Sequence, residues 1–342
     1  MFTEYSEESR IIRPTETQPV TVTTRIRIDP LTKHTVRITP RRTDDPPIDF
    51  SNPPYREHVA ESGPTCPFCP GRIGETTPRF PPEICGEGRF VFAGSILFPN
   101  LFPYGRHSAV AVFSPAHFIE IGEFTGNEYR DAFINARGYI ERVFTIDPEV
   151  RFSAVTQNYL PSSGGTLIHP HLQINIFVTP TNYLRELSDC SARYHTETGR
   201  SFWDDLVQKE EALGGRWIAR TGPIAWFTPF APQGQKEVWA VFEGRSDFRE
   251  ITDNELAILS GGIVSVQRYY RDTGNNSFNL GAYSIAGQDS DYRLLVRMVV
   301  RTKYIPYARN DQSYFEVILG EAATDEFPEK IASDLKKYLD SY

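Results

Sequence analysis

Residues 158–177 read NYLPSSGGTLIHPHLQINIF, and the interpretation of the whole chain starts from this stretch. An H-P-H-x-Q element follows a loop of small residues and continues into a run in which apolar and polar residues alternate. Alternation of this kind predicts a strand, in which residues two positions apart share a face. We therefore expect His169, His171 and Gln173 on one face. Small residues at Ser162–Gly165 let backbone N–H groups approach an anion.

The histidine pair suggests phosphoryl chemistry. A neutral imidazole is a good nucleophile toward phosphorus, and a covalent intermediate divides one difficult displacement into two easier ones. Its other ring nitrogen must be held by an acceptor, so that the attacking nitrogen keeps a free lone pair. We expect His171 to attack and Gln173 to donate to a non-bridging phosphate oxygen. The alternative is that these histidines bind a metal or are ordinary strand residues.

A second motif, CPFC at Cys66–Cys69, predicts a metal site. The two thiols are soft ligands in one turn, and tetrahedral zinc needs two more ligands, commonly histidines. His117 and His169 are the best candidates, and His107 is the alternative fourth ligand. Such a zinc site would fix the chain two residues from His171. The competing interpretations are a redox pair or a motif without a metal.

The order of elements repeats along the chain. SAVAVF, a helical segment beginning at GNEYRD and the strands RFSAVTQ and HPHLQINIFV are followed by EVWAVF, a second helical segment and the strands SFNLGAYS and YRLLVRMVVR. This duplication predicts an α+β fold of two tandem halves, each a largely antiparallel sheet with packed helices. We expect a mobile N-terminal segment at 1–22, a catalytic half with the zinc site at 23–195, and a non-catalytic half at 196–342. None of the seven histidines lies in the second repeat.

Composition excludes several other classes. The 342 residues carry a formal net charge of −8, which argues against a nucleic-acid partner because phosphate contacts need a basic face. No apolar run is long enough to span a bilayer, and the N-terminus lacks the apolar core of a secretory signal. We therefore expect a cytoplasmic protein without a membrane partner.

Several motifs occur in an order that resembles a known family. CPFCPG, FPNLFP, GRHSAVAVFSPAH and GGTLIHPHLQ are similar to the galactose-1-phosphate uridylyltransferases of the histidine-triad superfamily, and the resemblance covers most of the chain. It implies a zinc-containing homodimer that transfers nucleotides by a ping-pong mechanism through His171 and Gln173, with a nucleotide sugar and a sugar 1-phosphate as substrates. The zinc ligands that it implies are Cys66, Cys69, His117 and His169. The substrate-binding residues that it implies are Arg42, Asn100, Asn158, Gly164, Gly165, Thr166 and Glu316.

The departures from the family concern the sugar. After Arg42 the chain runs Thr43-Asp44-Asp45, so an acid stands where a second basic residue is usual, and a hexose-contacting glutamine and a lysine of the family are missing near Ala322 and Asn310. We therefore expect transfer of a nucleoside monophosphate, UMP by resemblance, from a nucleotide sugar to a sugar 1-phosphate. A phosphorylase or hydrolase that uses phosphate or water is the first alternative. A non-catalytic nucleotide-binding relative is the second.

Overall fold

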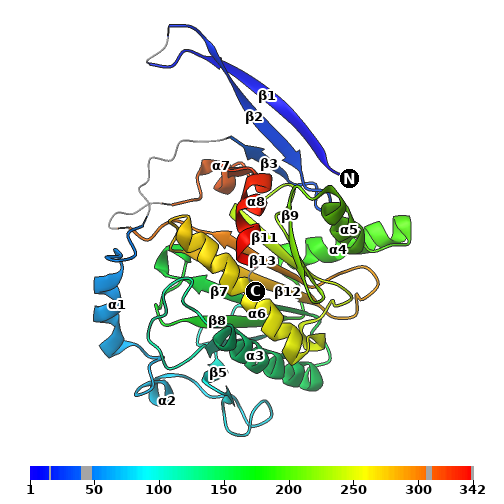
Figure 1. The fold of residues 1–342 in the computed structure, drawn as a ribbon. Coiled ribbons are helices and arrows are strands. Elements are labelled where there is room, and N and C mark those ends of the chain that lie inside the picture. The colour runs from blue at the N-terminus through cyan, green and yellow to red at the C-terminus, as the bar shows by residue number, and fades with distance from the viewer. Residues whose placement is uncertain (15–16, 40–47, 306–309, 340–342) are drawn as a thin grey trace.

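The computed structural model describes residues 1–14, 17–39, 48–305 and 310–339, and its centre is one long sheet (Figure 1). The strand order is β4-β5-β6-β8-β7-β12-β13-β11-β10-β9, and every neighbouring pair is antiparallel. These strands are β4 (Phe90–Phe92), β5 (Ser95–Pro99), β6 (His107–Val112), β7 (Phe152–Tyr159), β8 (His171–Phe177), β9 (Trp217–Thr221), β10 (Ile224–Phe227), β11 (Gln235–Phe242), β12 (Phe278–Ile285) and β13 (Leu295–Val300).

The predicted duplication is confirmed in the pairing of these strands. In the first half β8 lies between β6 and β7, and in the second half β13 lies between β11 and β12. In each half a long helix follows the first of these three strands. Helix α3 (Gly126–Ile146) follows β6, and α6 (Asp253–Asp272) follows β11. The two half-sheets join edge to edge through β7 and β12, so the α+β halves share one sheet.

The long helices begin at matching signals and cover the same face of the sheet. Thr125 and Thr252 each form a capping box with the glutamate three residues later, which satisfies the free N–H groups of the first turn. The helices lie side by side (Figure 1), and their apolar residues, such as Phe133 and Ile263, join one core with the sheet.

The opposite face is covered only at its two ends. At β5 and β6, α2 (Ile73–Thr76) and the loop before it contribute Ile73 and Phe68 to a small apolar cluster. Over β10, β11 and β13, α4 (Asn182–Thr198) and α5 (Phe202–Leu213) contribute Leu184 and Trp203 to a second core. Between the two covers, parts of this face on β7, β12 and β13 line a pocket, whereas His171 at the start of β8 is buried.

A close approach between α6 and the sheet makes one glycine essential. A Cβ on Gly262 would lie 2.1 Å from Cζ2 of Trp226, whose ring is 1% exposed. We expect Gly262→Ala to cost on the order of 3 kcal/mol of unfolding free energy, because the packed ring cannot move away. The matched control is Gly138→Ala in α3, where no atom lies within 4 Å of the added Cβ. This control variant should instead raise the unfolding free energy by about 0.5–1 kcal/mol. Urea unfolding of both variants checks this, and equal effects would contradict it.

A second, smaller sheet lies apart from the main one. Its order is β1-β2-β3-β14, with β14 parallel to β3. Its strands are β1 (Thr3–Ile11), β2 (Val20–Ile28), β3 (Thr35–Ile38) and β14 (Ala322–Thr324). Residues 23–39, which read TTRIRIDPLTKHTVRIT, contain the second part of β2, a turn and β3. The buried Arg27 ties the sheet to the C-terminal helix α8 (Pro328–Leu339), with Nη1 3.0 Å from Glu329 Oε1.

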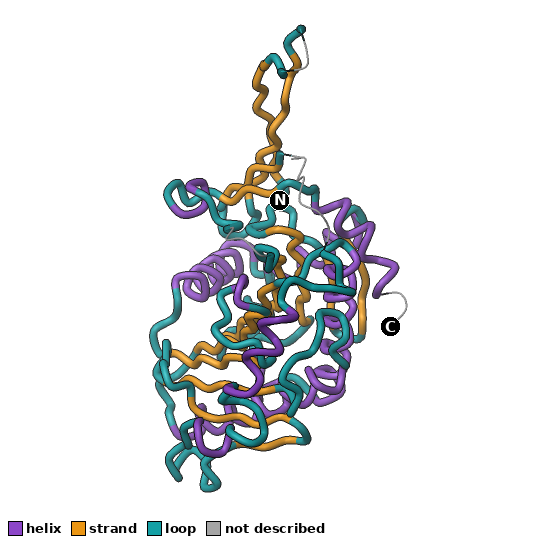
Figure 2. Tube along the Cα trace, turned by 90° about the vertical axis from the view of Figure 1, so that its left-hand side faces the viewer, coloured by secondary structure: helices purple, strands orange, loops and turns teal. Residues whose placement is uncertain are grey.

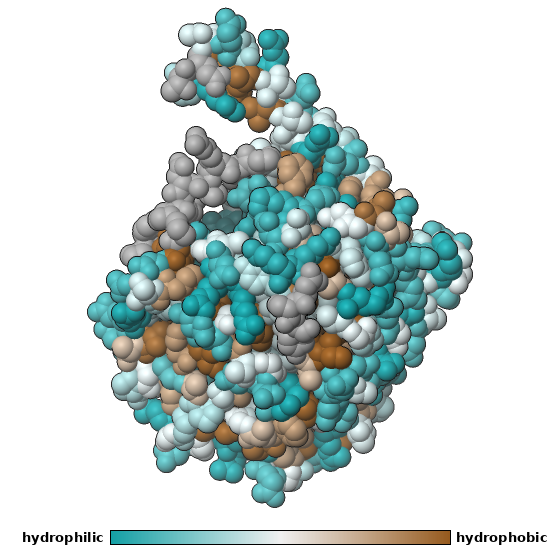
Figure 3. Space-filling view, viewed as in Figure 1, coloured by the Kyte–Doolittle hydropathy of each residue, from teal (hydrophilic) through white to brown (hydrophobic). Residues whose placement is uncertain are grey.

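The N-terminus differs from the expectation of a mobile segment over residues 1–22. Residues 3–11 instead form β1, and all nine pair with β2. The resulting hairpin projects from the body (Figures 2 and 3), with β1 exposed along its length. Backbone pairing and ion pairs such as Arg25–Glu4 hold β1 to β2, and the sequence of β1, TEYSEESRI, carries no apolar alternation that would have indicated a strand.

The remaining helices are α1 (Arg56–Ser62) and α7 (Tyr314–Val317), with short 3-10 turns at Gly63–Thr65, Pro161–Ser163 and Phe248–Glu250. Within the described parts of the chain, no helix combines the length and apolar character needed to cross a membrane. The face shown in Figure 3 is mainly hydrophilic, with hydrophobic residues in small patches.

Candidate active site and metal centre

The four predicted metal ligands lie together. Each of Cys66, Cys69, His117 and His169 offers one ligand atom, and these four atoms all lie within 4.8 Å of one another. His169 Nδ1 is 3.8 Å from both sulfurs, and His117 Nδ1 is 3.4 Å from Cys69 Sγ. A tetrahedral zinc with usual bond lengths separates nitrogen and sulfur ligands by about 3.6 Å. The cluster contains His117 and not His107, whose Nε2 instead lies 2.8 Å from Asp147 Oδ2.

Both histidines of the cluster turn Nδ1 toward the sulfurs because Nε2 is held elsewhere. His169 Nε2 is 3.0 Å from the Ser114 carbonyl, and His117 Nε2 is 3.1 Å from Ser62 Oγ. A carbonyl only accepts, so Nε2 of His169 carries the proton and Nδ1 has the free lone pair. Burial is the main cause that lowers the pKa of His169 to about 4, which keeps it neutral.

The pKa of the thiols gives a second indication of whether the cluster fits a metal ion. Burial, followed by the neighbouring Cys66, raises the pKa of Cys69 to about 11. Two thiols close together therefore resist losing their protons unless a positive charge lies between them. A divalent cation supplies that charge and binds the thiolate form. The donor set, the spacing and the ring orientations all fit a four-coordinate metal.

His171 has the geometry expected of a nucleophile. Its Nδ1 lies 2.8 Å from the carbonyl of His169 and must donate to it, so Nε2 keeps a lone pair. Burial lowers the pKa of His171, so the ring is neutral at pH 7. The ring of Phe68 meets it edge-on with centroids 5.4 Å apart. The Cys/His cluster and His171 are thus joined by a single carbonyl, that of His169.

The side chains of this region share the face of the sheet opposite α3 and α6, where His171 is buried and Gln173 and Asn158 are half-buried. Thr156 pairs with Gln173 across β7 and β8, so both point to the same face. His171 lies two residues before Gln173, and Asn158 lies two residues after Thr156 on the neighbouring antiparallel strand. Both therefore point to that same face. Leu172, between the histidine and the glutamine, points into the core under α3.

The loop between β7 and β8 is shaped by two unusual backbone conformations. Leu160 has a φ of 68°, rare for a residue with a side chain, and Gly164 has a φ of 97°. A Cβ on Gly165 would lie 3.3 Å from the Leu160 carbonyl, so the loop packs tightly on the end of β7. The hydroxyl of Ser162 is buried without a partner among the described residues. A loop of this kind leaves donors for an anion.

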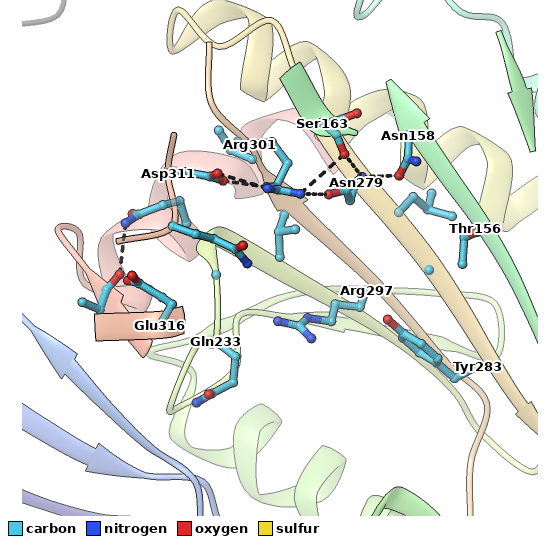
Figure 4. A pocket seen from close by; sticks show the side chains of 18 residues that line it. Thr156, Asn158, Ser163, Gln233, Asn279, Tyr283, Arg297, Arg301, Asp311 and Glu316 are labelled. Carbon is cyan, nitrogen blue, oxygen red and sulfur yellow. Dashed lines mark hydrogen bonds and ion pairs between the residues drawn. The ribbon is translucent and has the colours of Figure 1, made fainter. Parts of the chain in front are cut away.

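Next to this loop is a polar pocket of about 450 Å³ (Figure 4). Its floor is the uncovered face of β7, β12 and β13, and its walls come from the turn before β11 and from the segment around α7. Figure 4 shows Arg297 extending into it, backed by Glu237 with Nε 2.6 Å from Oε1. The lining residues that carry polar side chains are Thr156, Asn158, Ser163, Gln233, Gln235, Asn279, Tyr283, Arg297, Arg301, Asp311, Gln312 and Glu316.

The structure separates the predicted substrate residues into groups. Asn158 and Glu316 line the pocket, although a carboxylate oxygen of Glu316 also accepts from the Ser313 N–H to cap α7. Gly164 and Gly165 adjoin Asn158, and Thr166 is exposed beyond them. Asn100 follows β5 and accepts from the Phe102 N–H. Arg42 lies outside the described residues, and His171 and Gln173 do not line the pocket.

Apart from Glu316, the pocket residues of the second half were not predicted. Asn279, Arg297, Arg301 and Asp311 come from a repeat without histidine, and none belongs to a recognisable motif. The spacing of Arg297 and Arg301 along a strand, which places both on one face, is the only sequence signal for them.

Comparison with solved structures shows that this fold is known. An ADP-glucose phosphorylase from Arabidopsis thaliana, solved with ADP-glucose, matches with a TM-score of 0.69 and 20% identity, covering 91% of this chain and 98% of that one. A GalT-like protein from Arabidopsis thaliana matches with a TM-score of 0.70 and 18% identity over 91% and 98% of the two chains. A uridylyltransferase matches with a TM-score of 0.66 and 20% identity over 92% and 98%. No protein-family model matches.

The chain thus has the fold of the galactose-1-phosphate uridylyltransferase class, as the sequence resemblance predicted. It belongs to the same family as an uncharacterized protein of Archaeoglobus fulgidus, with which it is 30% identical over 314 residues, 91% of each chain.

Proposed function

We propose that the protein is a nucleotidyltransferase that carries a nucleoside monophosphate on His171. One observation carries this proposal: Nδ1 of His171 is committed to the carbonyl of His169, so Nε2 is a neutral nitrogen with a free lone pair. That is the state in which an imidazole attacks phosphorus.

The two half-reactions need no proton on the attacking nitrogen. In the first, Nε2 of His171 bonds to the α-phosphorus of a nucleotide sugar, and the bond from that phosphorus to the bridging oxygen breaks. The sugar 1-phosphate leaves with the electron pair, and the ring becomes cationic while Nδ1–H still donates to the His169 carbonyl. In the second, a phosphate oxygen of the acceptor attacks the same phosphorus, and the P–N bond breaks to restore the neutral ring.

Around that phosphorus the structure supports the roles implied by the resemblance. Gln173 shares the face of His171 and would donate to a non-bridging oxygen. Asn158 and the Gly164–Thr166 loop would hold the phosphates. The adjoining polar pocket would take the sugar, with Glu316 at its wall. Arg42 and Asn100 stay proposals from the resemblance.

We propose zinc for the Cys66, Cys69, His117 and His169 cluster, with a structural role. Bound there, the ion would neutralise two thiolates and fix the backbone at His169, whose carbonyl orients His171. Because the thiols must stay reduced to bind it, we place the activity in the reducing cytoplasm.

We propose UMP as the transferred group and a sugar 1-phosphate as the acceptor, by resemblance. Phosphorolysis, with inorganic phosphate as the acceptor, is a second candidate. It is favoured by the departures at Ala322 and Asn310 and by the likeness to an ADP-glucose phosphorylase.

Covalent labelling tests this function and separates the candidates. The protein is incubated with UDP-glucose, ADP-glucose or GDP-mannose, each labelled in the phosphate next to the nucleoside. We expect acid-labile, base-stable label on the wild type, strongest with UDP-glucose. Galactose 1-phosphate should then release the label as UDP-galactose, whereas a phosphorylase would release it with phosphate as UDP. No label with any donor would refute the proposal and favour a nucleotide-binding protein.

We also propose a homodimer with active sites at the subunit interface. Supporting it, α7 and the turn after it expose a cluster of large apolar side chains, Tyr314, Val317, Ile318 and Leu319, each at least 60% exposed. Sedimentation equilibrium should give twice the chain mass.

A further inference from the structure

Asn279 of the second half makes direct contact with the phosphate-binding elements of the first half. It pairs with Asn158 where β12 and β7 join the two halves, so both side chains point to the uncovered face. Nδ2 of Asn279 lies 2.6 Å from Asn158 Oδ1 and 3.1 Å from the carbonyl of Ser163, the residue before Gly164 (Figure 4). One amide group therefore holds both the strand residue and the loop.

The direction of every hydrogen bond in this cluster is fixed by Arg301. Nη1 of Arg301 lies 2.5 Å from Asn279 Oδ1, and a guanidinium can only donate. The Asn279 oxygen therefore accepts, and its NH₂ group donates to the Ser163 carbonyl, which can only accept. The same NH₂ group donates to Asn158, so the Asn158 atom facing it is the oxygen.

This direction leaves the NH₂ group of Asn158 as a free donor. Asn158 Nδ2 itself donates a hydrogen bond to none of the described residues. The group faces the small-residue loop, because a Cβ on Gly164 would have Nδ2 as its one neighbour, 3.9 Å away. A donor oriented beside the loop that precedes His171 is suited to a phosphate oxygen, whereas the amide oxygen in its place would repel it.

Arg301 is itself anchored by a carboxylate. Its Nε and Nη2 lie 2.6 Å and 3.0 Å from the two oxygens of Asp311. Asp311 also accepts from the hydroxyl of Thr302 and donates its backbone N–H to it. Figure 4 shows the side chains in a row from Asp311 through Arg301 and Asn279 to Asn158.

We propose that Asn279, Arg301 and Asp311 are positioning residues for nucleotidyl transfer, which set the amide of Asn158 so that its NH₂ group faces the phosphate. The proposal rests on the function proposed above. It also gives the second half, which lacks histidine, a direct part in the reaction: it determines whether the first half offers a donor or an acceptor to the substrate.

Asn279→Asp is the decisive variant because it changes the hydrogen-bond direction at nearly constant shape. A carboxylate still accepts from Arg301 but cannot donate to Asn158, which must rotate and present its oxygen to the phosphate. We expect the labelling rate at saturating donor to fall about 10- to 100-fold, the usual effect of losing one donor to a charged group. The loss should be equal for UDP-glucose and UDP-galactose, because the amide faces the phosphate.

A double-mutant cycle and a matched control separate positioning from other effects. In an Asn158→Ala background, Asn279→Asp should cost clearly less than in the wild type, because no amide remains to be oriented and only the hydrogen bond to the Ser163 carbonyl is still lost. Asn175→Asp is the charge control: Asn175 lies on the same face of β8, and its oxygen already accepts from the Ser108 hydroxyl. It should label within about threefold of the wild type. A full loss in the Asn158→Ala background, a loss that depends on the sugar, or an equal loss in Asn175→Asp would overturn the proposal.

Binding of UMP, measured by calorimetry, decides the question independently of catalysis. The wild type should bind UMP, and Asn279→Asp should weaken binding about 10-fold or more, with its melting temperature nearly unchanged. If the wild type binds UMP but takes no label, the covalent mechanism is refuted. The calorimetric comparison with Asn279→Asp still tests whether Asn279 orients the amide of Asn158. Equal affinity of the two proteins, or no binding by the wild type, would reject the role of Asn279.

Discussion

His171→Asn is expected to abolish nucleotidylation of the protein and to lower the transfer rate on the order of 10⁴-fold or more. The amide nitrogen of the new side chain lies where Nδ1 of the imidazole lies, so it still donates to the His169 carbonyl. The variant therefore keeps the local hydrogen bond and loses only Nε2. Quench-flow labelling and the steady-state rate measure the two effects.

Gln173→Ala is the matched comparison for this experiment. Its side chain shares the face of His171, and removal of one donor to a developing charge costs about 10²–10³-fold in rate. Label should therefore still form in Gln173→Ala, only more slowly. Label of the same acid lability on His171→Asn, or a loss in Gln173→Ala as complete as that in His171→Asn, would contradict the assigned roles.

The features that the sequence predicted correctly are those with local signals. Thr125 and Thr252 each precede a glutamate by three residues, and this pattern marks the start of both long helices. The alternation after H-P-H predicted β8, with His171 and Gln173 opposite the core face. The metal cluster could be predicted because a CxxC turn restricts its partners to a few histidines.

The features that it missed depend on contacts distant in sequence. Asn279 and Asn158 are 121 positions apart and meet only because β7 and β12 join the two half-sheets. The repeated order of elements in the sequence predicts two similar halves, but it does not say which strand edges of the two halves meet. Strand β1 was missed for a different reason. It is ordered by backbone pairing with β2 and by surface ion pairs such as Arg25–Glu4, and its own sequence has no periodic apolar pattern.

The proposed metal centre and the proposed nucleophile share one backbone group, the carbonyl of His169. The ring of His169 faces the sulfurs of Cys66 and Cys69, and its carbonyl holds Nδ1 of His171. A change at the metal ligands should therefore alter both the folding stability and the chemistry. Because the contact is a single hydrogen bond, the chemical effect should be smaller than that of replacing His171 itself.

Cys66→Ser is accordingly expected to remove the bound zinc, to cost on the order of 4 kcal/mol of stability and to slow labelling more than about 10-fold. A hydroxyl is not a thiolate ligand, and the remaining three side chains would leave a buried, unbalanced site. Metal analysis should give one zinc per wild-type chain and none in the variant, with a clearly lower melting temperature. Cys85→Ser is the control, because Cys85 lies outside the cluster and its thiol donates to the Arg89 carbonyl, a bond that a hydroxyl can also make. It should keep zinc and activity. A wild type without metal, or Cys66→Ser with a full equivalent of zinc, would show that this cluster is not the metal site.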